Sequence, residues 1–381
     1  MSAPIVVVGG GLAAGTAVTE LRESGYDGEL VLLAGEPHVP YERPPLSKGF
    51  LAGEKTAESA YVRPADWYAE QHVDLRTNTQ VSALDPGSRT VTTVGGDVVT
   101  YAKLLLATGA RARTLPLEPT REIQVRYLRT LDDATELKDH LGTDRRLLVV
   151  GAGWIGMEVA ASARTLGTTV TVVEPAAHPL GALGEEIGER FAAVHRAHGV
   201  DLRTGTGLDR LDGGAAVLGD GTRLEVDTVL VGVGAVPNDD LGRAAGLPVD
   251  NGILVDAGLR AVDGVYAAGD VANAEHPLLG ERVRVEHWQN AISQGKAAAH
   301  ALLGEEVSYD ELPYFYTDQY DLGMEYFGHV GTAGFDKLEV EDGTDGAFAG
   351  FWWRGDRLVA ALHVNQWDRS DELRGRVHSG R

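Results

Sequence analysis

Short apolar runs, each bounded by glycine or polar turns, recur along the chain and predict the buried strands of a parallel sheet. The first run covers residues 5–8 (Ile-Val-Val-Val) and leads directly into Gly9-Gly10-Gly11. A helix is predicted from Ala13 to about residue 23, and a second apolar run covers residues 30–33. This order of strand, glycine turn, helix and strand predicts a βαβ unit at the start of the chain.

The same pattern begins again near the middle of the chain. An apolar run at 147–150 is followed by Gly151-Ala152-Gly153, a helix predicted to about residue 166, and another run at 170–173. Each half then passes through a β-rich insertion and closes with a strand that ends in glycine, at 104–109 and at 228–234. We interpret the repeat as an internal duplication.

Three further segments complete the outline of the fold. The strand at 264–270 also ends in a glycine turn but has no helical unit of its own, so it is predicted to return to the first half. Residues 34–55 are rich in Pro and Gly without periodicity, and a loop of that length is usually functional. After about residue 308 the chain becomes acidic and aromatic, which predicts a small α+β C-terminal domain.

Both glycine turns have the spacing of a dinucleotide-binding fingerprint, in which a tight turn places a helix N-terminus against a pyrophosphate. Glu36 and Glu174 follow the next strand of each half, where a carboxylate accepts hydrogen bonds from an adenosine ribose. Because Glu174 would repel a 2′-phosphate and no arginine follows it closely, the second half is predicted to bind NAD(H). The fingerprint residues are Gly9, Gly11, Ala13 and Ala14 in the first half, and Gly151, Gly153, Trp154, Ile155 and Gly156 in the second.

Composition and charge limit the possible functions. A chain of 381 residues is too long for one hydrophobic core and predicts two or three domains. A formal net charge of −22 argues against binding to nucleic acid, which needs a basic surface. No apolar run is long enough to span a membrane, and the start Met1-Ser2-Ala3-Pro4 leaves no room for a signal peptide. The protein is therefore predicted to be cytoplasmic.

The chain contains no cysteine, which excludes disulfides, thiolate metal sites and a thiol nucleophile. His195 and His198 are three residues apart on a predicted helix, but without a third ligand they predict no metal site. Residues 305–350 carry twelve acidic side chains and one lysine, half of the formal charge. We interpret this stretch as a solvated acidic surface, with electrostatic steering of a partner as the alternative.

Five further motifs occur at 40–48 (PYERPPLSK), 107–109 (ATG), 128–134 (LRTLDDA), 268–272 (AGDVA) and 285–291 (VEHWQNA). Together with the fingerprints they resemble the NADH-dependent ferredoxin and rubredoxin reductases, a cysteine-free branch of the FAD-containing pyridine-nucleotide oxidoreductases. The resemblance implies an α/β fold like that of glutathione reductase, with two Rossmann-like dinucleotide-binding domains and a small α+β C-terminal domain. The implied boundaries are 1–112 and 236–308 for FAD, 113–235 for NADH, and 309–381 for a C-terminal interface domain.

The resemblance also implies roles for individual residues. Lys48 is expected near the flavin N5 edge, Glu158 opposite Lys48 where nicotinamide docks, and Trp288 beside the isoalloxazine on the electron exit route. These three are the predicted catalytic residues. FAD is implied at the first fingerprint and at Glu36, Arg43, Lys48, Ala107, Thr108, Gly109, Asp270 and Trp288; NADH is implied at the second fingerprint and at Glu158, Glu174 and Gly234.

The reaction implied is oxidation of NADH by FAD, followed by delivery of single electrons to a ferredoxin-type [2Fe-2S] protein or a rubredoxin of an oxygenase system. Because no cysteine can relay electrons, they must leave the reduced flavin directly. Two alternatives stay open: an enzyme that reduces oxygen, a quinone or another small acceptor, and an NADH-responsive flavoprotein resembling apoptosis-inducing factor. We expect a monomer or homodimer without nucleic acid or membrane partners.

Overall fold

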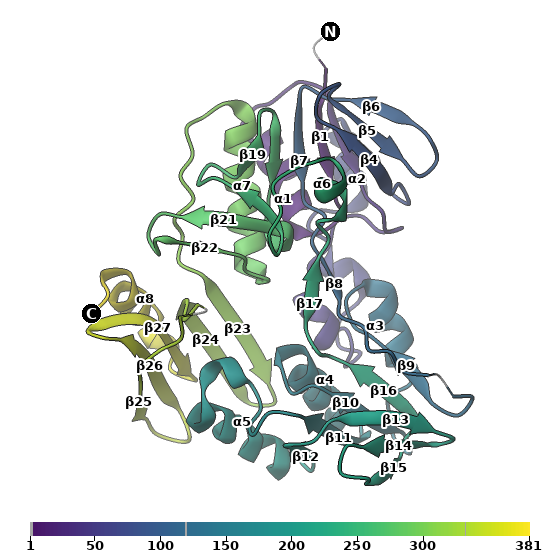
Figure 1. The fold of residues 1–381 in the computed structure, drawn as a ribbon, viewed down its shortest axis with the longest axis vertical. Helices are drawn as coiled ribbons and strands as arrows, with labels where there is room; N and C mark the ends of the chain where they lie inside the picture. Colours follow the sequence, from purple (N-terminus) through teal and green to yellow (C-terminus); the bar gives the residue numbers. More distant parts are fainter. Residues whose placement is uncertain (1–2, 119, 332) are drawn as a thin grey trace. The chain divides into compact units, whose positions relative to one another are not determined.

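The computed structural model describes residues 3–118, 120–331 and 333–381, and the chain forms two compact units (Figure 1). The first unit contains Met1–Glu42, Glu58–Arg111 and Val236–Phe315. The second contains Arg43–Ala57, Ala112–Ala235 and Tyr316–Arg381. Each unit carries one of the two fingerprints.

A six-stranded sheet forms the core of the first unit, in the order β19-β20-β7-β1-β2-β3. All its pairings are parallel except the one between β19 and β20. Every residue of β1 and β2 is buried, as expected for parallel strands covered on both faces. The strands are β1 (Ile5–Val8), β2 (Leu30–Leu33), β3 (Val73–Arg76), β7 (Lys103–Leu106), β19 (Arg260–Val262) and β20 (Val265–Ala267).

Two helices lie side by side against this sheet, as Figure 1 shows. Helix α1 (Leu12–Glu23) contacts β1 and β2, and helix α7 (Trp288–Leu303) contacts β7 and β20. Their backbones approach so closely that a Cβ at position 295 would lie only 2.7 Å from the Ala13 carbonyl oxygen, and Gly295 permits this approach because it has no side chain. The unit also contains α2 (Ala65–Glu70), α6 (Asp240–Ala244), β4 (Val81–Asp85), β5 (Thr90–Thr93), β6 (Val98–Thr100), β18 (Ile253–Val255), β21 (Ala272–His276) and β22 (Glu281–Val283).

The second unit is built on a five-stranded parallel sheet in the order β12-β11-β10-β16-β9. Helix α4 (Trp154–Thr165) packs on β10 and β11, and helix α5 (Glu185–Ala197) packs on β12. The strands are β9 (Gln124–Arg126), β10 (Arg146–Val150), β11 (Thr169–Glu174), β12 (Asp201–Thr204) and β16 (Thr228–Val231). The unit also holds α3 (Leu131–Lys138), β13 (Leu208–Asp212), β14 (Ala215–Leu218) and β15 (Arg223–Glu225); β8 (Ala110–Ala112) and β17 (Ala235–Pro237) span the unit boundaries.

The two parallel sheets share one topology, which confirms the predicted duplication. In each, the fingerprint strand lies at the centre, the next two strands follow on one side, and the closing strand lies on the other. The segment at 264–270 supplies β20, which pairs with β7 and so returns to the first unit as predicted. In sheets of this kind, ligands bind where the strand order reverses, between β1 and β7 and between β10 and β16.

The C-terminal part is a five-stranded sheet in the order β23-β24-β27-β26-β25, with helix α8 (Ser370–Ser379) packed on β24 and β27. The fully buried Trp352 donates its indole N–H to the Leu183 carbonyl oxygen (3.3 Å), so this sheet packs onto the rest of the second unit. Its strands are β23 (Tyr314–Gln319), β24 (Leu322–Gly328), β25 (Lys337–Asp342), β26 (Phe348–Arg354) and β27 (Arg357–Val364).

The loop at 34–55 contains a short 3₁₀ helix, η1 (Pro44–Ser47). This helix was not predicted, because the segment shows no periodicity. Its two prolines fix φ near the helical value at the start of the turn. The helix packs on α3 and α4 of the second unit, and the Ser162 hydroxyl donates to the Ser47 carbonyl oxygen (2.7 Å). These contacts of η1 fix the backbone immediately before Lys48. Within the described residues, no helix has the length and apolar character needed to cross a membrane.

Candidate active site

The first fingerprint turn requires glycine for steric reasons. Gly9 has φ +133°, and a Cβ there would lie 2.1 Å from the carbonyl oxygen of Ala107, which follows β7. Gly11 is the N-cap of α1; no side chain caps this helix, and its first turn holds no acidic residue. The first N–H groups of α1 are therefore not capped by a side chain, and a Cβ at Gly11 would meet nothing within 4 Å, which fits the pyrophosphate of a dinucleotide.

The second fingerprint repeats this geometry in the other unit. A Cβ at Gly151 (φ +101°) would lie 2.5 Å from the Gly232 carbonyl oxygen, and one at Gly156 would lie 2.1 Å from the Gly151 carbonyl oxygen. Gly153 caps α4 without a side-chain bond, and again no acidic residue occupies the first turn. Trp154 and Ile155 begin the helix, and the Ile155 side chain is 44% exposed. This helix N-terminus also fits a dinucleotide pyrophosphate.

The two predicted ribose carboxylates are both held in place. Glu36 accepts a hydrogen bond from the buried Tyr41 hydroxyl (2.5 Å). Glu174 accepts two backbone N–H bonds, from Ala152 in the fingerprint turn (2.8 Å) and from Ala176 (2.9 Å). Each carboxylate oxygen of Glu174 keeps a lone pair for a further donor, as a ribose hydroxyl would require.

The Ala107-Thr108-Gly109 turn is locked by Asn238, a residue that the sequence did not single out. The Thr108 hydroxyl donates to the Asn238 carbonyl oxygen, and the Asn238 side-chain amide donates to the Thr108 carbonyl oxygen, both at 2.8 Å. The Asn238 backbone N–H bonds the Gly109 carbonyl oxygen, and Gly109 itself has φ +67°. The turn is thus fixed at the end of β7, next to the first fingerprint.

Asp270 and Trp288 belong to the same unit as the first fingerprint. The half-buried Asp270 lies in the turn after β20, and the preceding Gly269 donates its N–H to the buried Gln294 side chain (2.9 Å). Trp288 is half-buried and is the first residue of α7. Gln294 lies on α7 and therefore links the Asp270 turn to the helix that carries Trp288. The sequence did not identify Gln294 as a site residue.

In the second unit, three side chains converge on a buried carboxylate. Glu158, on α4, is 4% exposed, and its Oε1 lies 2.7 Å from the Lys48 ammonium. Ser47 donates to Oε2 (2.5 Å), and Thr317 of β23 donates to Oε1 (2.6 Å). The Lys48 ammonium also lies over the Tyr316 ring, 5.2 Å from its centre. The predicted pairing of Lys48 with Glu158 is present, while Ser47 and Thr317 were missed.

Two predicted cofactor residues have other local roles in the second unit. Arg43 donates to the Arg129 carbonyl oxygen, which links it to the turn before α3. Gly234 has φ +103°, and its carbonyl oxygen accepts the Arg113 backbone N–H (2.9 Å). The contacts of Arg43, Lys48 and Gly234 with their cofactors stay predictions.

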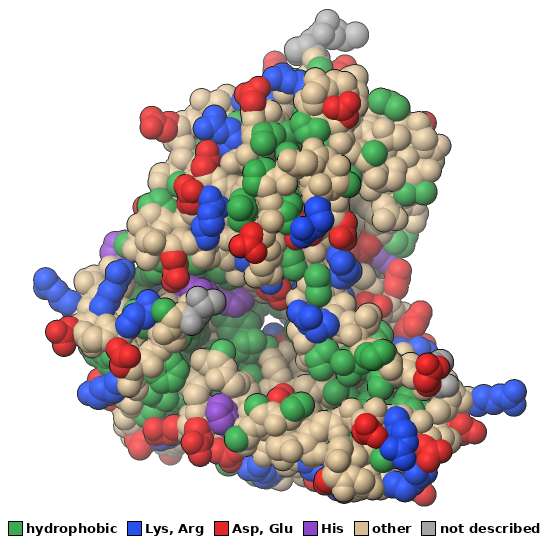
Figure 2. Space-filling view, in the orientation of Figure 1, with side chains coloured by type: hydrophobic (Ala, Val, Ile, Leu, Met, Phe, Trp, Pro, Cys, Tyr) green, Lys and Arg blue, Asp and Glu red, His purple; other side chains and the backbone are tan. Residues whose placement is uncertain are grey.

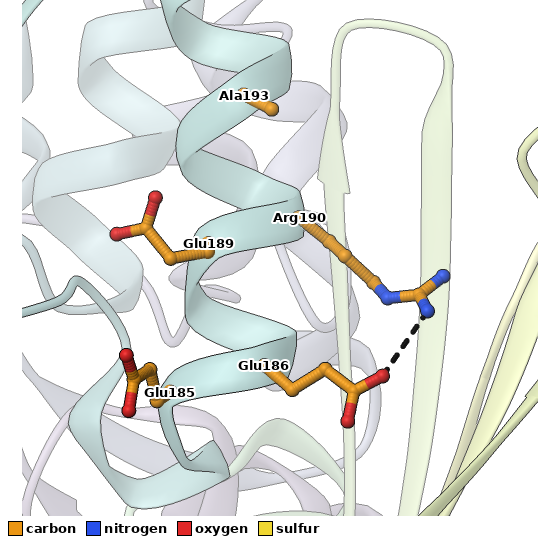
Figure 3. A pocket seen from close by; sticks show the side chains of 5 residues that line it. All are labelled: Glu185, Glu186, Glu189, Arg190 and Ala193. Carbon is orange, nitrogen blue, oxygen red and sulfur yellow. Dashed lines mark hydrogen bonds and ion pairs between the residues drawn. The ribbon is translucent and has the colours of Figure 1, made fainter.

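A shallow open pocket on α5 is a poor candidate for a cofactor site. Figure 3 shows its lining, which includes three carboxylates, with Arg190 paired to Glu186 at 3.2 Å. An acidic surface of this kind would repel the phosphates of a nucleotide. Across the described residues, no group of three or more His, Asp or Glu side chains is arranged to hold a metal ion. The lining residues are Glu185, Glu186, Glu189, Arg190 and Ala193.

Residues 3–295 match the model of the pyridine nucleotide-disulphide oxidoreductase family. The chain belongs to this family. It is 42% identical over 370 residues to the ferredoxin–NAD(+) reductase component of the anthranilate 1,2-dioxygenase system of Burkholderia cepacia, covering 95% of this chain and 91% of that protein. It is 34% identical to rubredoxin–NAD(+) reductase of Pseudomonas putida, covering 98% of both chains. The solved covalent complex of putidaredoxin reductase with putidaredoxin has a TM-score of 0.94 and 35% identity, covering 99% of this chain and 93% of that one.

Family membership confirms the predicted fold class and the predicted kind of enzyme. The protein is an NADH-dependent flavoprotein oxidoreductase whose cofactors are FAD and NADH. The "disulphide" in the family's name does not apply to its chemistry, because the sequence has no cysteine. Both open helix N-termini fit the two dinucleotides that such an enzyme holds.

Proposed function

We propose that this protein is the reductase component of an oxygenase system, which oxidises NADH and delivers single electrons to a ferredoxin-type [2Fe-2S] protein or a rubredoxin. For a one-electron acceptor the balance is one NADH and two oxidised acceptors giving NAD⁺, two reduced acceptors and one proton. The proposal is carried by two uncapped fingerprint helices in a chain that has no cysteine. A thiol relay is impossible, so the electrons must pass directly from the cofactor to the acceptor.

In this proposal the first fingerprint, Glu36, Asp270 and the Ala107-Thr108-Gly109 turn hold FAD, and the second fingerprint and Glu174 hold NADH. When bound, FAD accepts the electron pair of NADH as a hydride and releases the electrons one at a time. Lys48 supplies a fixed positive charge, and such a charge stabilises negative charge that develops on a nearby ring in a site of low dielectric constant. Glu158 holds that ammonium in place at 2.7 Å.

Trp288, Arg43 and Gly234 complete the proposed site, with Trp288 beside the flavin on the electron exit route. The division into FAD, NADH and interface domains at 1–112 with 236–308, 113–235 and 309–381 is part of the same proposal. A cytoplasmic location and a monomeric or homodimeric state stay predictions, which cell fractionation and light scattering test.

The choice of acceptor is tested by steady-state turnover of the purified yellow protein with NADH. We expect rapid reduction of cytochrome c only when a [2Fe-2S] ferredoxin or a rubredoxin is added, with two molecules of cytochrome c reduced for each NADH consumed. Rapid peroxide formation without a protein acceptor would instead favour an oxidase. A long-lived complex of the reduced protein with NAD⁺ and negligible turnover would favour a redox-sensing role.

A further inference from the structure

A line of buried hydrogen bonds runs through the second unit from helix α5 to Glu158. The Thr317 hydroxyl bonds the Glu158 carboxylate (2.6 Å), the Gln319 amide nitrogen bonds the Thr317 hydroxyl oxygen (3.2 Å), and the His195 ring bonds the Gln319 amide oxygen (2.8 Å). None of these four side chains is more than 4% exposed. Residues 317 and 319 share one face of β23 because strand side chains alternate.

Chemistry fixes the direction of every bond in this line. A carboxylate only accepts, so the Thr317 hydroxyl must donate to Glu158 and accept from Gln319. The Gln319 oxygen then accepts from His195, whose Nε2 must carry the proton. Burial lowers the pKa of His195 to about 4, so the ring is neutral at pH 7 and has a single N–H. Its Nδ1 has no hydrogen-bond partner among the described residues, consistent with that tautomer.

We infer that Thr317, Gln319 and His195 are positioning residues that hold the Glu158 carboxylate against the Lys48 ammonium during hydride transfer. This inference rests on the proposed function, in which Lys48 and Glu158 stand beside the reacting cofactors. Every donor in the line points toward Glu158, so each bond polarises the next in the same sense. The C-terminal strand β23 thereby supplies part of the active site.

The line is not a route for protons. Conduction along hydrogen bonds needs groups that accept a proton on one side and give one up on the other. The carboxamide of Gln319 is not readily protonated, so a proton would stop there. An orienting role remains, and it matters because hydride transfer depends on alignment of the reacting groups to a fraction of an ångström.

The test replaces Thr317 with valine, which keeps the shape and removes the hydroxyl. We expect Thr317→Val to slow flavin reduction by NADH about three- to tenfold in stopped-flow experiments, the effect of losing one hydrogen bond that aligns the site. The long-wavelength charge-transfer absorbance of the reduced flavin with NAD⁺ should weaken in parallel, because nicotinamide stacking is less well fixed. Thr317→Ser, which restores the hydroxyl, should recover both values.

Two controls separate positioning from a general loss of structure. Thr228→Val makes the same change at a buried threonine at the start of β16, outside this line, and should leave the reduction rate and the charge-transfer band unchanged. In a Glu158→Leu background, Thr317→Val should change the rate less than about twofold, because the line then has no carboxylate to hold. If Thr317→Val lowers the melting temperature or the FAD content, Gln319→Leu repeats the test one bond further out.

The outcomes distinguish this inference from the proposed function. A wild-type reduction rate and charge-transfer band in both Thr317→Val and Gln319→Leu, with Lys48→Met and Glu158→Leu clearly slow, overturn the inference and leave the proposed function intact. An equal effect of Thr317→Val with and without Glu158 also overturns it. Wild-type rates in Lys48→Met and Glu158→Leu would instead remove these residues from the proposed site.

Discussion

Glu174 illustrates how a single residue can set the cofactor preference. Its two oxygens are each held by a backbone N–H, one from the fingerprint turn and one from Ala176. The carboxylate therefore has little freedom to turn away from a group placed beside it. A ribose hydroxyl can donate to it, whereas a 2′-phosphate would meet a fixed negative charge.

We expect Glu174→Ala to lower kcat/KM for NADH about tenfold, the usual cost of losing a hydrogen bond to a charged group. The kcat/KM for NADPH should stay constant or rise, so the preference for NADH over NADPH, given by the ratio of the two kcat/KM values, decreases. The measurement is steady-state ferricyanide reduction with each nucleotide. Glu225→Ala, which removes an exposed carboxylate from β15, is the control and should leave the ratio unchanged. Equal use of NADH and NADPH by the unmodified protein would contradict this role.

His195 makes the folded chain sensitive to acid. Its pKa is about 4 in the folded protein, against an ordinary value of 6.5, because burial disfavours the charged ring; the neighbouring His198 lowers it further. The unfolded chain therefore binds one more proton than the folded chain between these two values. Stability due to this residue is present above pH 6.5 and is lost as the pH falls toward 4.

The expected loss is about 3 kcal/mol, from roughly 2.5 pKa units at 1.36 kcal/mol each. We predict that the melting temperature of His195→Gln, measured from pH 7.5 to 4.5, falls less steeply with acid than that of the unmodified protein. His198→Gln changes an exposed histidine three residues away and removes only the smallest cause of the low His195 pKa, so it should reduce the slope much less than His195→Gln does. Identical slopes for His195→Gln and the unmodified protein would show that the ring is not held neutral by burial.

Helix α4 shows at the level of one element that two fingerprint glycines serve different purposes. A Cβ at Gly156 would collide with the Gly151 carbonyl oxygen at 2.1 Å, whereas a Cβ at Gly153 meets nothing within 4 Å. Gly156 is thus required for the first turn of α4 to pack against the glycine turn that follows β10. The space beside Gly153 is free of protein atoms and is available to a bound ligand.

We predict opposite behaviour for alanine at these two positions. Gly156→Ala should destabilise the protein by about 1–3 kcal/mol, as overpacking does, and should lower its melting temperature without NADH present. Gly153→Ala should melt at the original temperature but raise the KM for NADH about tenfold, because its methyl group occupies the space of the pyrophosphate. A normal KM in Gly153→Ala would contradict the placement of the pyrophosphate at this turn.

The elements predicted from the sequence are those that local patterns determine. The β1–α1–β2 and β10–α4–β11 units follow from buried apolar runs and from glycines at positive φ, all within about 30 residues of one another. Asn238, Ser47 and Thr317 were missed because their partners lie far away along the chain. Asn238 bonds a turn 130 positions away, and Ser47 and Thr317 reach Glu158 across 111 and 159 positions. No periodicity in the sequence reports such contacts.

At the scale of the whole molecule, the formal charge of −22 affects how a partner approaches. Figure 2 shows acidic and basic side chains interspersed over the visible face. Four arginines are candidates for meeting an acidic ferredoxin: Arg111, Arg113, Arg126 and Arg284. Three of them are already paired with carboxylates of this chain. The pairs are Arg111 with Asp240 (3.0 Å), Arg126 with Glu136 (3.7 Å) and Arg284 with Glu286 (2.5 Å).

Arg113 differs from these three because it is exposed and lies within 4 Å of no carboxylate among the described residues. An arginine without an internal partner can offer its full charge to an acidic protein. We therefore expect Arg113→Glu to lower kcat/KM for an acidic [2Fe-2S] ferredoxin more than Arg111→Glu does, although both variants change the net charge equally.

The dependence of the electron-transfer rate on salt concentration tests this role of Arg113 in docking a ferredoxin. With the unmodified protein and an acidic ferredoxin below saturation, the rate should rise as salt is increased to about 0.15 M, since a Debye length of about 8 Å screens the overall repulsion. The difference between Arg113→Glu and Arg111→Glu should shrink over the same range, while NADH oxidation by ferricyanide stays constant in both. If the two variants are equally impaired at every salt concentration, only net charge matters and Arg113 takes no part in docking. If neither is impaired, the partner approaches another face or carries little negative charge.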